Sequence, residues 1–196
     1  MGSKERILKK KAEVSNMIIE VAMDILNSEG IDGITIRNIA SRIEYSPPVI
    51  YSHYQNKDAL TDQLIIIGFN KLLERIISNE RDSGSSAVKL EHMFRNYIEF
   101  ALENKPLYLL MSHRIVGSSI GKIKNKTDEF SALLKAEIQR MIPVKKNTFQ
   151  VDDIYFGMIS LVHGIVSVCY TSDEYSIKDG DAAVRMMIKG FLEERK

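Results

Sequence analysis

Cysteine is nearly absent from this sequence, and its charges almost cancel. The single cysteine among 196 residues, Cys169, excludes an intrachain disulfide framework and suits a reducing cytosol. A net charge of +1 excludes a general polyanion binder. The first twenty residues also lack the apolar core of a signal peptide, so we expect a cytoplasmic protein.

The patterns that carry catalysis or metal binding are also missing. The four histidines have no metal-ligand spacing, and no glycine-rich phosphate loop occurs. We therefore expect no enzyme, no cofactor and no metal. No segment alternates with period two for long enough to form a sheet, which predicts an all-α fold. The most apolar stretch, Ile154 to Tyr170, is shorter than the roughly 20 residues that span a bilayer, so we expect a buried helix there.

Three closely spaced helix starts are present between residues 35 and 60. Thr35, Ser46 and Asn56 are candidate N-caps, because a side-chain oxygen just before a helix accepts hydrogen bonds from its first N–H groups. Pro47 and Pro48 follow the second cap, where a missing N–H costs little. An amphipathic helix precedes this region and ends at Gly30, which we expect to close it as a Schellman cap.

This arrangement is typical of a helix-turn-helix, which places a short helix in the DNA major groove. The apolar faces of the short helices form a core, and the remaining side chains face outward. We assign most of these to phosphates and leave Pro47, Pro48 and Ser52 for base edges, which favours contact with thymine methyl groups. The predicted DNA-binding residues are Thr35, Arg37, Ser46, Pro47, Pro48, Tyr51, Ser52, His53 and Lys57.

From Ile18 to Leu64 the chain resembles the TetR family of transcriptional repressors. The resemblance rests on the glycine-closed first helix, Thr35-Ile36-Arg37, Ile39-Ala40, Tyr51-Ser52-His53-Tyr54 and Asn56-Lys57-Asp58-Ala59-Leu60. It implies a three-helix DNA-binding domain with a helix-turn-helix over residues 1–60 and a helical-bundle domain for ligand binding and dimerisation over residues 61–196. It also implies a homodimer that releases its DNA when a small molecule binds.

Glu44 departs from the family pattern, which usually has glycine in the turn between the second and third helices. If the turn needs a positive φ there, Glu44 is strained by roughly 1 kcal/mol relative to glycine. A turn built differently is the alternative.

A run of basic residues precedes the DNA-binding segment: Lys4, Arg6, Lys9, Lys10 and Lys11. Such an arm can add phosphate contacts and salt dependence to DNA binding. A solvated or disordered terminus explains the run equally well.

The last two predicted helices, about residues 148–171 and 180–194, are the expected dimer interface. The first is apolar on nearly all sides and needs a cover beyond its own domain, and in the family these two helices pair with their symmetry mates. The predicted interface residues are Ile159, Val162, His163, Val166, Met187 and Phe191. Val162-His163-Gly164 resembles the Trp-His-Gly motif of one TetR subgroup, although the tryptophan is absent.

A small-molecule site is implied by the family resemblance and has an aromatic and methionine-rich candidate lining. It comprises Met93, Phe94, Tyr97, Phe100, Tyr108, Met111, Phe130, Leu134 and Met158. Such a lining suits a largely apolar or aromatic effector, and ordinary helical core is the alternative.

These observations favour a ligand-responsive repressor that binds a palindromic operator of double-stranded DNA as a homodimer. A helical adaptor that binds proteins and uses its helix-turn-helix only structurally is the competing hypothesis.

Overall fold

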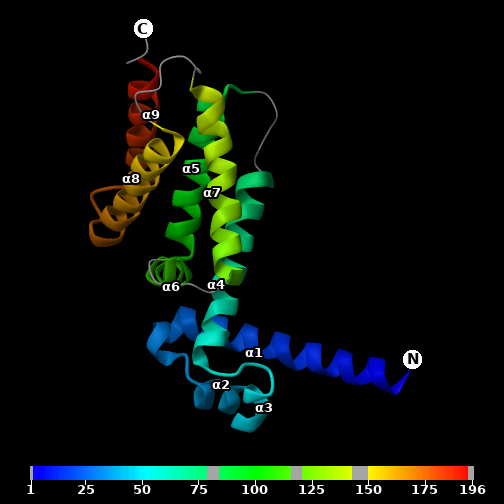
Figure 1. The fold of residues 1–196 in the computed structure, drawn as a ribbon. Coiled ribbons are helices and arrows are strands. Elements are labelled where there is room, and N and C mark those ends of the chain that lie inside the picture. The colour runs from blue at the N-terminus through cyan, green and yellow to red at the C-terminus, as the bar shows by residue number, and fades with distance from the viewer. Residues whose placement is uncertain (1, 79–83, 116–120, 143–149, 194–196) are drawn as a thin grey trace. The chain divides into compact units, whose positions relative to one another are not determined.

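The computed structural model describes residues 2–78, 84–115, 121–142 and 150–193, and over these residues all regular secondary structure is helical. The all-α prediction is therefore confirmed. The helices, coloured along the chain in Figure 1, are α1 (Ser3–Gly33), α2 (Ile36–Arg42), α3 (Pro47–Tyr51), α4 (Lys57–Ser78), α5 (Ser86–Glu103), α6 (Lys105–Ile115), α7 (Gly121–Met141), α8 (Val151–Thr171) and α9 (Ile177–Glu193).

The chain divides into two compact units. Unit 1 comprises Met1–Gly68 and Pro106–Gly117, and unit 2 comprises Phe69–Lys105 and Ser118–Lys196. Unit 1 therefore includes α6 from Pro106 onward and α4 up to Gly68, whereas the boundary expected from the sequence lies between residues 60 and 61.

The core of unit 1 is built from the apolar faces of short helices, as the sequence spacing predicts. On α1, apolar residues at three- and four-residue steps face inward, and Ile18, Ala22 and Ile25 have no exposed surface. The core also contains Ile39 from α2 and Ile50 from α3, both fully buried. A fully buried side chain of this kind contributes about 1.5–3 kcal/mol, so this small core fixes the angles of α2 and α3.

Two of the three predicted N-caps form side-chain hydrogen bonds. Thr35 Oγ1 accepts from the Asn38 N–H at 3.1 Å, and Asn56 Oδ1 accepts from the Ala59 N–H at 2.8 Å. Ser46 occupies the N-cap position of α3 without a side-chain cap. The physical reason is that both following residues are prolines without an N–H, and the next N–H, on Val49, bonds to the Ser46 carbonyl at 2.9 Å.

Gly30 has a positive φ, as expected, but does not form the Schellman cap. Its φ of 74° and ψ of −170° lie in a region that only glycine occupies readily. Ile31, whose side chain would cover the helix in a Schellman cap, is 42% exposed. The reason is that the extended ψ carries the chain away from α1 before a short helical segment ends at Gly33.

The Schellman geometry occurs instead at the end of α2, around Glu44. This residue has a φ of 58°, so the turn does need a positive φ. The Tyr45 N–H bonds to the Ala40 carbonyl at 3.0 Å and the Glu44 N–H to the Ser41 carbonyl at 3.4 Å, which is the paired pattern of this motif. A glutamate therefore occupies a backbone position that favours glycine.

Unit 2 is organised around α5, which packs against α7, α8 and α9. Phe94 and Ile98 of α5 are fully buried. The Tyr97 ring lies 5.6 Å from the Phe130 ring, and its hydroxyl is 3.3 Å from Nε2 of His163 on α8.

Charged groups link the second half of α4, α5 and α9 at the surface of unit 2. Arg75 donates to Glu99 at 2.9 Å and to Glu103 at 3.0 Å. Arg95 pairs with Glu99 at 3.0 Å and with Asp181 at 3.2 Å. Because several charges share partners, this network constrains geometry more than isolated surface pairs would.

Replacing Glu44 with glycine should raise the free energy of unfolding by about 0.5–1 kcal/mol. Relief of the left-handed strain is worth about 1–2 kcal/mol, and the more flexible unfolded chain offsets part of it. Urea denaturation at constant m-value measures the change. Glu44→Ala is the control, since it removes the charge and keeps the strain; equal stability of the two variants would show that the backbone position carries no strain.

Candidate nucleic-acid interface

The reading surface of unit 1 is the outer side of α3. Ile50 points into the core, whereas Pro47, Pro48 and Ser52 are exposed and Tyr51 is 54% exposed. The structure thus brings the predicted base-contacting residues together on one accessible face. This separation of faces follows from helical periodicity on a helix of only five residues.

The Ser52 hydroxyl already has a donor role within the fold. Its Oγ donates to the Val49 carbonyl at 2.7 Å. The hydroxyl therefore presents acceptor lone pairs outward, which suits the amino groups of adenine or cytosine.

Both arginines of α2 are exposed, but they differ in their partners. Arg42, one turn later, pairs with Glu29, and Asn38 Nδ2 donates to the same carboxylate at 3.0 Å. No ion pair of Arg37 occurs in the part of the chain that the structure describes. Arg37 is exposed, so its guanidinium is available to a phosphate.

Lys57 has a structural contact that the sequence did not predict. Its ammonium donates to the Ile31 carbonyl at 3.1 Å, which links the start of α4 to the end of α1. A cation near a helix C-terminus is favourable, so Lys57 contributes to the fold of unit 1. Its contact with phosphate stays a prediction.

His53 lies just after α3 and is partly buried. Burial lowers its pKa below the ordinary value of 6.5, and the Lys11 ammonium lowers it further. The imidazole is therefore neutral near pH 7 and can donate one hydrogen bond.

Next to α3 lies a groove, most of whose lining residues are not among the predicted DNA-binding residues. It has a volume of about 410 Å³ and lies between the N-terminal half of α1 and the end of α3. Its lining residues are Ile7, Lys10, Lys11, Val14, Tyr45, Val49, Ser52 and His53. The signal in the sequence was the basic run, which is helical in the structure and continuous with α1.

The nine predicted effector-pocket residues are buried. Each is at most 6% exposed. Tyr108 and Met111 lie on α6 in unit 1, and the other seven lie in unit 2. Tyr97 and Phe130 are in ring contact, but the assignment of these residues to an effector stays a prediction.

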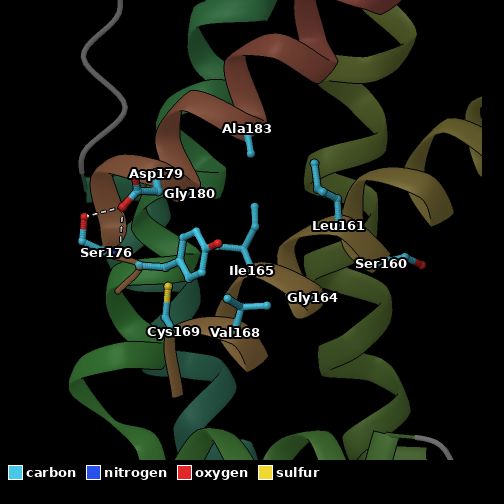
Figure 2. A pocket seen from close by; sticks show the side chains of 11 residues that line it. Ser160, Leu161, Gly164, Ile165, Val168, Cys169, Ser176, Asp179, Gly180 and Ala183 are labelled. Atoms are coloured by element: carbon cyan, nitrogen blue, oxygen red, sulfur yellow. Dashed lines mark hydrogen bonds between the residues drawn. The ribbon is translucent and has the colours of Figure 1, made fainter. Parts of the chain in front are cut away.

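The surface of unit 2 has a pocket between α8 and α9, with a volume of about 650 Å³. In Figure 2, Leu161, Ile165 and Val168 extend from α8 toward Ala183 of α9. The other lining residues are Ser160, Gly164, Cys169, Tyr175, Ser176, Asp179 and Gly180. Asp179 accepts hydrogen bonds from the Ser176 N–H and hydroxyl, both at 2.8 Å, and these contacts lower its pKa.

The predicted interface residues divide between the core and the surface. Val162 and Val166 are fully buried within the chain itself, because they face the other helices of unit 2. Ile159, His163 and Met187 are partly exposed, and the Phe191 side chain lies outside the described residues. The outward face of α8 and α9 carries Phe156, Val168 and Met186, which are 72%, 44% and 75% exposed.

The expectation that the most apolar segment is a buried helix holds for one face only. Among the described helices, α8 is the one that meets the length and composition of a membrane span. Only 22% of its most apolar stretch is buried in the chain. The rest of this stretch is at least partly accessible.

Comparison with known proteins agrees with this geometry. Residues 18–64 match the family model for bacterial regulatory proteins of the tetR family. The chain is 23% identical to the uncharacterized HTH-type transcriptional regulator YobS of Bacillus subtilis (strain 168), over 92% of this chain and 93% of that protein. A 49-residue stretch is 45% identical to the tetracycline repressor protein class A from transposon 1721 of Escherichia coli, covering 25% of this chain and 23% of the repressor. The TetR family transcriptional regulator PfmR of Thermus thermophilus has a similar fold, with a TM-score of 0.67 at 14% identity over 87% of this chain and 96% of that chain.

The exposed face of α3, held on a three-helix core, defines a DNA-binding protein of the helix-turn-helix class. The match of residues 18–64 covers this whole motif. Residues 18–64 are a domain of the tetR family of bacterial regulatory proteins, and the chain as a whole is similar to transcriptional regulators.

Two nearby tyrosines should separate DNA binding from stability. Tyr54 Oη is hydrogen-bonded to Ser15 Oγ at 3.0 Å, whereas Tyr51 is exposed on the reading surface. Tyr51→Phe should weaken binding to duplex DNA about tenfold, or about 1.4 kcal/mol, and leave the unfolding free energy unchanged. Tyr54→Phe is the matched control and should lower the unfolding free energy by about 1 kcal/mol with little effect on Kd.

Fluorescence anisotropy with a labelled duplex and urea denaturation measure the two effects. Loss of stability in Tyr51→Phe, with Kd unchanged, would contradict the assignment of this hydroxyl to DNA.

Proposed function

We propose that this regulator is a ligand-responsive repressor that binds a palindromic DNA operator as a homodimer. The observation that carries the proposal is the exposed reading face of α3, with Pro47, Pro48 and Ser52 directed away from the core. Repression, rather than activation, is supported by the local match to a protein that is named a tetracycline repressor. We propose that the protein acts in the cytoplasm and is not an enzyme.

The operator is proposed to contain important A·T pairs. Pro47 and Pro48 carry no side-chain hydrogen-bond donor, and apolar groups recognise the thymine methyl in the major groove. The acceptor lone pairs of Ser52 add a preference for an amino group nearby. Recognition of guanine by a bidentate arginine plays no part in this surface.

The homodimer is proposed to form through α8 and α9. Three large apolar side chains of these helices, Phe156, Val168 and Met186, are exposed, and Val168 also lines the pocket between the helices. A large exposed apolar patch of this kind marks an interaction surface. A second copy offers both the projecting side chains and the pocket, so a twofold interface buries both at once. Two reading helices then contact half-sites about 34 Å apart, one turn of DNA.

The effector is proposed to be small and largely apolar, and to bind among the aromatic residues of unit 2. Glu137 lies on the same face of α7 as Phe130 and Leu134, two turns after the first and one turn after the second, and is 3% exposed. Its Oε2 is buried with no hydrogen-bond partner among the described residues. A buried unpaired oxygen is costly, so an effector that carries one donor group would gain from this position. The effector releases DNA only if it binds the DNA-incompetent conformation more tightly.

Selection of genomic fragments with the purified protein, followed by a salt titration, tests the function. Enrichment of a short palindrome with a steep salt dependence is the expected result. Binding that survives replacement of its A·T pairs would contradict the proposed readout. No enrichment over random DNA would favour the adaptor hypothesis instead.

Replacing Gly164 with arginine should convert the dimer to a monomer. Gly164 lines the pocket, and a Cβ added there meets no atom within 4 Å. The variant should therefore fold, with a helix propensity better by up to about 1 kcal/mol, while its charge blocks the apolar interface. Light scattering after size exclusion measures the mass, and operator affinity should fall with it.

Ala132→Arg is the matched control for this substitution. Ala132 is exposed on α7 and does not line the pocket between α8 and α9, so the same charge there should leave the dimer intact. A dimeric Gly164→Arg protein would contradict the proposed interface.

A further inference from the structure

We propose that the groove between the N-terminal half of α1 and the end of α3 is a second DNA contact, which holds the sugar–phosphate backbone beside the major-groove contact of α3. This inference rests on the proposed operator binding and extends it to residues outside the helix-turn-helix. The groove residues Lys10 and Lys11 are the proposed phosphate ligands.

One wall of the groove is a single face of α1. Ile7 is three residues before Lys10 and four before Lys11, and Val14 follows these two lysines at the same spacings, so all four lie on one side of a continuous helix. Val14 is 7% exposed and belongs to the core, whereas Ile7 is 65% exposed. The helix therefore continues past the core of unit 1 and carries its lysines outward along the same face.

The other wall is formed by α3 and the residues on either side of it. Val49 is part of α3, Ser52 and His53 follow directly after it, and Tyr45 precedes it. The groove is thus continuous with the surface that meets the bases. A duplex seated on α3 brings its backbone next to this wall, because the phosphates border the major groove.

The charge of the groove identifies its occupant. In the described chain neither Lys10 nor Lys11 has an ion-pair partner, whereas the adjacent Lys9 lies 4.0 Å from Glu13. Lys4 shares the helical face of Lys11 and extends the positive stripe by two turns. Apolar groups on both walls, Ile7 and Tyr45, suit the deoxyribose between the phosphates. Positive charge beside apolar surface therefore matches a nucleic-acid backbone.

His53 gives independent support for the closeness of the two walls. Its pKa is lowered by burial and then by the charge of Lys11, so the ammonium on α1 acts on the imidazole after α3. The groove also contains Lys10 and Tyr45, and among the residues that the structure describes no carboxylate lines it. A phosphate in the groove would offset the Lys11 charge and raise the pKa of His53.

The test is the salt dependence of binding to a labelled 30-base-pair duplex of random sequence, measured by anisotropy. Phosphate contacts are independent of sequence, and each contributes about 0.9 to the slope of log K against log salt concentration. The double variant Lys10→Gln/Lys11→Gln should lower this slope by about 1.8 and weaken binding at least about tenfold. The double variant Lys10→Arg/Lys11→Arg should restore both values.

Lys9→Gln is the matched control, since it removes one charge from the same helix but outside the groove. It should retain the wild-type slope. In the DNA-free protein, NMR titration of His53 should show a higher pKa in Lys11→Gln and no change in Lys9→Gln, which also verifies that the variants are folded.

The outcomes separate this inference from the function on which it rests. A wild-type slope in the Lys10→Gln/Lys11→Gln protein, with Tyr51→Phe still weakening binding, would overturn the second contact and leave DNA binding intact. Absence of salt-dependent duplex binding by the wild-type protein would overturn the proposed function itself. Loss of binding to anionic lipid vesicles, with duplex binding unchanged in the double variant, would assign the groove to a membrane surface and also overturn the inference.

Discussion

The DNA-reading surface depends on two sharp reversals of the backbone, at Gly30 and at Glu44. Both residues have a positive φ, and each lies between helices that must share one small core. Glycine accommodates the first reversal without steric cost, but at the second a glutamate does so through a Schellman motif. Since α3 has only five residues and buries mainly Ile50, its direction depends on this turn together with the packing of Ile50 in the core.

The two units differ in how completely they bury their apolar residues. Unit 1 buries most of its isoleucines, Ile18, Ile39 and Ile50 among them, and leaves polar groups and prolines outside, as a surface that meets DNA requires. Unit 2 leaves much of α8 uncovered, and Val168 of this helix is both exposed and part of the pocket wall. An exposed apolar helix is unfavourable in water, and the proposed second copy would cover the apolar surface of α8 that the single chain leaves exposed.

For an effector in unit 2 to change DNA binding by unit 1, a structural element must connect the two units, and α4 contains residues of both. The helix α4 is continuous from Lys57 to Ser78, with Leu64 buried in unit 1 and Leu72 buried in unit 2. Arg75 on its second half is held by Glu99 and Glu103 of α5. A ligand that changes the preferred position of α5 thereby changes the free energy of this contact, which is the differential interaction that a population shift needs.

Local sequence patterns determined the all-helical fold, the caps at Thr35 and Asn56, the positive φ at Gly30 and the outward face of α3. They did so because helix periodicity and capping depend on neighbours within a few residues. Only the tertiary structure decided which face of α8 is buried, that Lys57 contacts the Ile31 carbonyl, and that Lys10 and Lys11 share a groove with His53. These features join residues far apart in the sequence, and an apolar or basic residue carries no local signal of the partner that packing will give it.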